Sequence, residues 1–161
     1  MLPFRSQPPP PRLREGYRLL GDAKPAPEDL NRLLLACGER PRPPERWCRA
    51  LQRSAWQLVM LDPQGRTVGF VRATSDQALN ANLWDLLADP ADPNRAEIFT
   101  TLVETALARL RRELSGCSIS LSAPPEALQA LTGAGFVVDP GGIRAMGLQL
   151  TTDQPRHDPP R

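Results

Sequence analysis

The chain has 161 residues, a length typical of one domain, and 40% of them are hydrophobic, which is enough to form a core. Its 20 basic and 18 acidic residues leave a net charge of +2, too balanced to indicate a nucleic-acid partner. Three cysteines without metal-ligand spacing, and a single histidine in a polar tail, argue against a zinc site and against a Ser-His-Asp triad.

Proline and charged residues dominate both ends of the chain. Residues 1–14 and 152–161 are predicted to be disordered tails, because they carry too few apolar side chains to pack. One domain is expected between them, at residues 15–151. No apolar run approaches the length of a membrane span, and the N-terminus lacks the apolar segment of a secretory signal. We therefore expect a cytoplasmic protein that contacts neither membrane nor nucleic acid and holds no metal.

The N-terminal half of this domain divides into elements at its proline and glycine residues. Pro27 and Pro44 are each followed by an acidic residue, which is typical of a helix start, and Gly38 follows the first helix. The segment Asp62-Pro-Gln-Gly65 indicates a tight turn inside a hairpin. The elements predicted here are a strand at 17–20, helices from Pro27 and Pro44, and strands at 56–61 and 67–74.

The C-terminal half is organised around one long amphipathic helix, predicted at residues 94–114. Its apolar side chains form two adjacent rows, one from Ile98 to Leu110 and one from Phe99 to Leu107, so we expect it to pack on a sheet. The strand before it, at 82–88, is apolar almost throughout and is predicted to lie inside the sheet. The remaining predicted elements are a strand at 118–122, a short helix at 125–130, and strands at 136–139 and 143–150.

This order of elements resembles the GNAT (GCN5-related N-acetyltransferase) superfamily, most of all its cyanobacterial and plastid branch. The resemblance covers about residues 16 to 150 and is carried by the stretches 69–76, 82–85, 89–90, 135–136 and 139–144. It implies an α/β, GNAT-like fold, in which a central mixed, mostly antiparallel β-sheet is flanked by helices on both faces. The element order independently indicates an α/β sandwich on one mixed sheet.

The resemblance also implies an activity, the transfer of an acetyl group from acetyl-CoA to an amine. The acceptor would be a small amine, a lysine or a protein N-terminus, and the protein a monomer or homodimer. The pantetheine arm would bind main-chain groups near Leu86 and Ala88. The diphosphate would lie on the loop that opens the long helix, near Arg95, Ala96 and Ile98.

That loop departs from the family pattern, because it contains no glycine. Family members carry glycines there, which let the backbone approach a diphosphate closely. The best alignment places Glu97 and Phe99 at those positions, and Phe99 is equally explained as part of the apolar helix stripe. Asn94 and Glu97 also have the spacing of a capping box, and Asp92-Pro93 offers an alternative helix start.

A second departure concerns the tyrosine that commonly protonates the leaving thiolate in the family. Leu131 occupies the expected position in the short helix, and Tyr17, the only tyrosine of the chain, belongs to the first strand. The sequence therefore leaves two functions open. One is an N-acetyltransferase with an atypical phosphate loop. The other is a catalytically inactive GNAT scaffold that acts as an interaction module or acyl-CoA sensor.

Polar residues remain on the side where an acceptor would bind. Asp85 is the candidate general base, directly or through water, although it also fits a charged residue at a strand edge or in a turn. Ser75, Asp76 and Asn82 are candidates for lining an acceptor pocket, with ordinary turn chemistry as the alternative. Trp84 is expected in the core.

Overall fold

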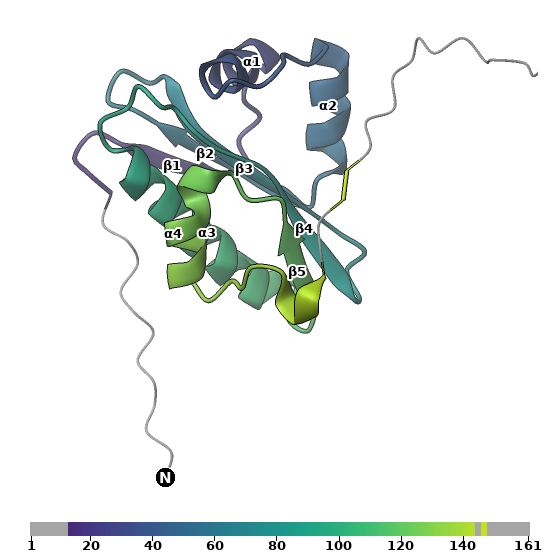
Figure 1. Cartoon of the computed structure of the whole chain (residues 1–161). Coiled ribbons are helices and arrows are strands. Elements are labelled where there is room, and N and C mark those ends of the chain that lie inside the picture. The colour runs from purple at the N-terminus through teal and green to yellow at the C-terminus, as the bar shows by residue number, and fades with distance from the viewer. Residues whose placement is uncertain (1–12, 144–145, 148–161) are drawn as a thin grey trace, which may run out of the picture.

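The computed structural model describes residues 13–143 and 146–147, in which helices cover both faces of one five-stranded sheet (Figure 1). The strands lie in the order of the chain, and every neighbouring pair is antiparallel except the parallel β4–β5 pair. Their bounds are Arg18–Gly21 (β1), Trp56–Leu61 (β2), Thr67–Ser75 (β3), Asn80–Ala88 (β4) and Ser118–Leu121 (β5).

The helices divide into two layers, one on each side of the sheet. Helices α1 (Pro27–Ala36) and α2 (Pro44–Arg53) cover one face, while α3 (Arg95–Glu113) and α4 (Leu128–Gly133) cover the other. Two single 3-10 turns complete the described elements, η1 at Pro125–Ala127 and η2 at Pro140–Gly142. The mixed sheet between helical layers confirms the predicted α/β fold class.

Each face of the sheet has its own hydrophobic core. The core under α1 and α2 centres on Trp47, whose ring meets Phe70 edge to face with centroids 6.1 Å apart. The core under α3 contains the row from Ile98 to Leu110 and, from the second row, Val103 and Phe99, which is 2% exposed. Leu107, at the end of the second row, is only half-buried and does not belong to this core. Phe99 therefore lies in the core, as the helix periodicity predicted.

Three expectations about local structure were wrong, and a fourth concerns a segment that lies mostly outside the described residues. The capping box was wrong, because the side chain of Asn94 makes no cap hydrogen bond and Glu97 pairs with Arg14. Trp84 was wrongly placed in the core, because it is 44% exposed. The stretch 136–139 is not a strand. The strand predicted at 143–150 falls mostly outside the described residues.

Gly69 in β3 sets how closely α3 approaches the sheet. A Cβ atom at this position would lie 2.7 Å from Cγ2 of Ile98, 3.0 Å from Cβ of Met60 and 3.1 Å from Cδ1 of Leu102. Gly69→Ala is therefore expected to lower the free energy of unfolding by about 1–3 kcal/mol through overpacking. Urea denaturation followed by circular dichroism measures this.

The matched control is Gly133→Ala, where an added Cβ meets nothing within 4 Å. Because alanine favours helix more than glycine, this control is expected to cause no loss of stability. An equal effect at the two glycines would contradict the close approach of α3 to β3.

Candidate functional site

The sheet is split between its last two strands. β4 pairs with β5 only over Asn80–Leu83, opposite Ser118–Leu121, and then continues alone to Ala88. Among the residues that the structure describes, β4 pairs over 84–88 with β3 alone. Apart from the carbonyl of Ala88, to which Arg95 and Cys37 donate, the main-chain groups on its other side are therefore open to a ligand that lies along the strand.

A β-bulge distorts β4 just after the split begins. Arg72 pairs with Trp84 and Phe70 pairs with Leu87, so β4 spans one residue more than β3 between these two pairs. Within the bulge, Asp85 has a φ of 54°, a left-handed conformation that costs free energy for a residue with a side chain. The side chains of Trp84, which pairs with Arg72 across the strands, and of Asp85, the bulged residue, both contact Arg72.

The carboxylate of Asp85 is held by two arginines. Nε of Arg72 lies 2.6 Å from one carboxylate oxygen and Nη2 of Arg42 lies 2.7 Å from the other, and the Asp85 side chain is only 7% exposed. Arg72 also lies 5.9 Å from the ring of Trp84, whose Nε1 donates to Oγ1 of Thr74. Sequence spacing could not reveal Arg42 and Arg72 as partners, because the loop before α2 and the bulge bring them together.

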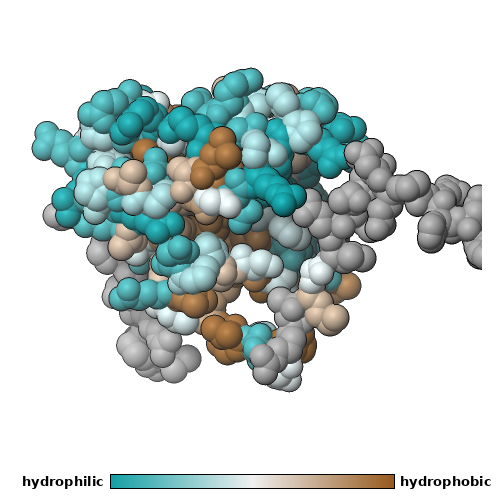
Figure 2. All heavy atoms as spheres, turned by 45° about the horizontal axis from the view of Figure 1, so that its top comes forward, coloured by the Kyte–Doolittle hydropathy of each residue, from teal (hydrophilic) through white to brown (hydrophobic). Residues whose placement is uncertain are grey.

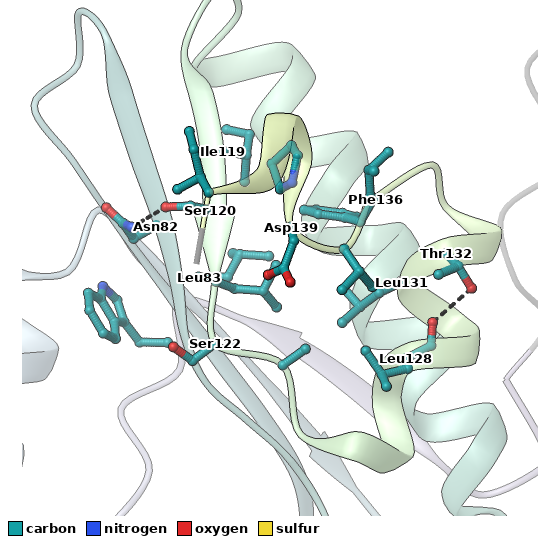
Figure 3. Close-up of a pocket in the computed structure, with 17 residues that line it drawn as sticks. Asn82, Leu83, Ile119, Ser120, Ser122, Leu128, Leu131, Thr132, Phe136 and Asp139 are labelled. Carbon is teal, nitrogen blue, oxygen red and sulfur yellow. Dashed lines mark hydrogen bonds between the residues drawn. The ribbon is translucent and has the colours of Figure 1, made fainter. Parts of the chain in front are cut away.

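A pocket of about 570 Å³ opens at the split, bounded by β4, β5, α4 and the segment that follows α4 (Figure 3). Most of its lining is apolar and includes the buried Leu131. Among its polar side chains, Nδ2 of Asn82 donates to Oγ of Ser120, and the Asp139 carboxylate points toward the cavity in Figure 3. Asn82 is thus the predicted acceptor-side residue that reaches this pocket, while Asp85 lies beside it on the strand and is not in the lining.

Ser75 and Asp76 instead shape the turn between β3 and β4. Oγ of Ser75 donates to the carbonyl of Asn80 and accepts from the amide of Gln77, each at 2.8 Å. Oδ1 of Asp76 accepts from three successive main-chain amides, at residues 78 to 80. These amide hydrogen bonds hold the pKa of the Asp76 carboxyl well below its usual value.

The carbonyl of Ala88, at the end of β4, is already engaged by two side chains. Nε of Arg95 donates to it at 3.1 Å and Sγ of Cys37 at 3.4 Å. The guanidinium of Arg95 also lies over the ring of Phe99, 5.6 Å from its centroid, and 3.7 Å from a Glu126 carboxylate oxygen. Burial raises the pKa of the Cys37 thiol, so this group stays a protonated donor at neutral pH.

Two amides at the start of α3 remain available to an anion. The amide of Arg95 bonds to the Asp92 carbonyl at 3.2 Å, and that of Ile98 to the Asn94 carbonyl at 3.0 Å. Between them, the amides of Ala96 and Glu97 have no acceptor within the described part of the chain. The helix therefore presents two donors and the positive end of its dipole.

The groove beside these amides is acidic. It has a volume of about 540 Å³, lies between α3 and α4, and its charged lining residues are Glu97, Glu104 and Glu126. Arg14, from the segment before β1, partly offsets them through hydrogen bonds of 2.9 and 3.0 Å to Glu97. The groove thus combines helix-terminal donors with carboxylates that oppose a bound anion.

Tyr17, the residue before β1, holds the loop before α3 in place, a role that its sequence neighbours did not indicate. Its hydroxyl lies 3.0 Å from both carboxylate oxygens of Asp92 and accepts from Nδ2 of Asn94 at 3.0 Å. The hydrogen bond from Asn94 lowers the pKa of Tyr17, but burial and the Asp92 carboxylate outweigh it and raise the pKa above its usual value. No spacing rule links residues this far apart in the chain.

The described residues contain neither a metal-binding cluster nor a helix suited to a bilayer. Over 13–143 and 146–147, no three or more His, Cys, Asp or Glu side chains are grouped so that they could hold a metal ion. None of the helices found there is both long enough and apolar enough to cross a bilayer.

Known proteins with similar sequences and folds are acetyltransferases. No protein-family model matches the chain. It is 31% identical over 122 residues to the uncharacterised N-acetyltransferase ycf52 of Porphyra purpurea, covering 73% of this chain and 68% of that protein. It is 31% identical over 133 residues to the chloroplastic serotonin N-acetyltransferase 2 of Oryza sativa subsp. japonica, covering 78% and 63%.

Among solved structures, the fold matches a probable acetyltransferase from meticillin-resistant Staphylococcus aureus with a TM-score of 0.73 and 17% identity. The match covers 83% of this chain and 99% of that one. The sequence identity to ycf52, together with the split and bulged sheet, establishes that the chain belongs to the GNAT superfamily of N-acetyltransferases.

Proposed function

We propose that the protein transfers an acetyl group from acetyl-CoA to an amine at the split between β4 and β5. The observation that carries this proposal is the split itself, where no described strand covers one side of residues 84–88 and the 570 Å³ pocket opens. A pantetheine arm is a short chain of amides, so it matches unpaired main-chain donors and acceptors. We assign this contact to the main chain at Leu86 and Ala88.

The start of α3 is the proposed diphosphate site. The main-chain amides of Ala96 and Glu97 would donate to the diphosphate, and the Arg95 side chain, which is 26% exposed, would supply a positive charge. The amide of Ile98, whose side chain is buried, completes the first helical turn. The residues fit a diphosphate in their geometry but only weakly in their charge, because Glu97 and Glu126 face the same groove. We therefore expect acetyl-CoA to bind with lower affinity than a glycine-rich loop would give.

The proposed reaction is direct attack of the amine on the thioester carbonyl. A C–N bond forms, the C–S bond breaks, the thiolate of CoA leaves, and the ammonium proton passes to a base. Asp85 is our candidate base. It would act through a water molecule, because both its carboxylate oxygens are engaged by guanidinium groups and its side chain does not line the pocket. Asn82 is assigned to the acceptor pocket, and Ser75 and Asp76 to the turn that positions β4.

The acceptor class is an amine, such as the serotonin for which the rice relative is named, a lysine or a protein N-terminus. We further propose that the protein works in the cytoplasm as a monomer or homodimer. The three cysteines support a reducing compartment, because Cys37, Cys48 and Cys117 form no disulfide.

Titration of the protein with acetyl-CoA in a calorimeter tests the proposed function. We expect saturable binding that tightens when the groove loses carboxylates. Glu97→Gln and Glu126→Gln are each expected to lower the dissociation constant roughly two- to fivefold, the effect of about 0.3–1 kcal/mol per charge near a helix N-terminus.

The matched control is Glu39→Gln, an exposed glutamate that follows α1 on the other face of the sheet, and it is expected to leave the affinity unchanged. No binding by the wild type or by the Glu97 and Glu126 variants at millimolar acetyl-CoA would overturn the proposal. The inactive GNAT scaffold would then take its place.

A further inference from the structure

Positive charge is concentrated on one short stretch of the chain. Residues 39–53 contain five arginines and two glutamates, a net charge of +3, whereas the whole chain has a net charge of +2. The other residues together therefore carry a net charge of −1. This stretch consists of the loop before α2 and of α2 itself, and Figure 2 shows the face with α1 and α2 covered largely by hydrophilic side chains.

Three of these arginines line one side of α2. Arg46, Arg49 and Arg53 are spaced by three and four residues, so they follow one another along the helix, while Trp47 and Leu51 are buried beneath it. We call these three side chains the arginine face. All three are exposed, and within the described residues no ion pair or hydrogen bond engages them.

This lack of partners sets the arginine face apart from most arginines in the described part of the chain. Most other described arginines pair with carboxylates of the protein; these are Arg14, Arg32, Arg42, Arg66, Arg72, Arg95, Arg109 and Arg112. The arginine face is therefore a set of guanidinium groups that is held on a rigid helix and not neutralised by the protein. Such groups bind carboxylates through paired hydrogen bonds.

Both ends of α2 contact the bulge at the split. Arg42, just before the helix, pairs with Asp85 at 2.7 Å. Ser54, just after the helix, accepts a hydrogen bond from Arg72 at 3.4 Å, and Arg72 pairs with the same aspartate. A molecule bound along α2 consequently lies near Asp85, the proposed base, and near β4 where the split begins.

We propose that the arginine face binds an acidic segment of a protein acceptor and so delivers a nearby amine of that protein to the split. The inference rests on the proposed function and narrows its acceptor to a protein with acidic residues close to the acetylated amine. From Arg46 to Arg53 the helix rises about 10 Å, a distance spanned by roughly three residues of extended chain. Two or three carboxylates within such a segment match the face.

Fluorescence anisotropy with labelled peptides tests the inference without turnover. One peptide carries a free N-terminal amine followed by Glu-Gly-Glu-Glu, and its analogue carries Gln-Gly-Gln-Gln. The acidic peptide is expected to bind about tenfold more tightly, and this advantage should shrink as salt is raised. Arg46→Glu with Arg49→Glu is expected to abolish the advantage, and Arg46→Gln with Arg49→Gln to reduce it.

The matched control is Arg18→Glu with Arg111→Glu, which makes the same charge change at two exposed arginines on β1 and α3. It should keep the preference for the acidic peptide. Any of three outcomes would overturn the inference. The two peptides could bind equally well, or the two Glu double variants could lose the preference for the acidic peptide equally. The third is tighter binding of a single-stranded oligonucleotide of matched charge.

Acetyl-CoA titration separates this inference from the proposed function. Acetyl-CoA binding without any preference for the acidic peptide would overturn the acceptor assignment alone. A preference for the acidic peptide without acetyl-CoA binding would overturn the proposed acetyl transfer and leave the arginine face as a protein-binding surface, although no amine would then be acetylated there.

Discussion

Asp85→Ala is expected to lower the free energy of unfolding by about 3 kcal/mol and to reduce acetyl transfer by about a hundredfold. The stability loss has two sources. Arg72, whose side chain is 15% exposed, loses its nearest carboxylate, and alanine must adopt the left-handed backbone of the bulge. The activity loss follows from the proposed role of the carboxylate in accepting the ammonium proton through water. Urea denaturation and a coupled assay for released CoA measure the two effects.

Two further substitutions separate the causes. Asp85→Gly tolerates a φ of 54° but lacks the ion pairs, so it should be about 1 kcal/mol more stable than Asp85→Ala. Asp85→Asn tolerates the same backbone and keeps an acceptor for one arginine, so it should be the most stable of the three. If Asp85→Asn retained the wild-type rate across the pH range, Asp85 would be a structural residue and not the base.

Trp47→Ala is expected to lower the free energy of unfolding by about 3–5 kcal/mol, as large-to-small changes of buried aromatic residues do. Trp47 is 1% exposed, packs on Phe70, and its Nε1 donates to Oδ1 of Asn31 at 2.9 Å. The Asn31 side chain also donates to the carbonyl of Arg42 and accepts from its amide. The loop before α2 should therefore become more mobile as well. Far-UV circular dichroism in urea is the suitable measurement, because it does not depend on tryptophan fluorescence.

Trp84→Ala is the control for this prediction, since it makes the identical chemical change at a side chain that is 44% exposed. It removes one hydrogen bond to Thr74 and a distant contact with Arg72, and should cost about 1 kcal/mol. Comparable losses at the two tryptophans would mean that α2 is not anchored on the sheet through Trp47.

The elements that the sequence predicted well are those specified by local signals. Helix starts at Pro27 and Pro44, the turn at Asp62–Gly65 and the apolar rows of α3 all depend on residues close together in the chain, and the structure confirms each. The resemblance to the GNAT superfamily added the mixed, mostly antiparallel sheet with helices on both faces, and the family. Capping of α3 was mispredicted because Glu97 finds a stronger partner in Arg14, far away in sequence.

The candidate site was less predictable for the same reason. The partners of Asp85 come from the loop before α2 and from β3, and a bulge that no periodicity reveals places them on one carboxylate. Trp84 looked like a core residue because its strand is apolar, but it alternates with the buried Leu83 and lies next to Arg72 and Thr74 of β3. Irregular backbone thus decided the positions of the residues that matter most for the proposed chemistry.

The single tyrosine of the chain is also a natural spectroscopic reporter. Tyr17 is tied to Asp92 and Asn94 in the loop directly before α3, so its ring experiences any movement of that loop. Biosynthetic incorporation of fluorotyrosine places one fluorine-bearing residue in the whole protein, and its NMR signal needs no further assignment. Binding of a ligand to the amides of Ala96 and Glu97 should then change the chemical shift of this one resonance, although Tyr17 itself does not line the groove.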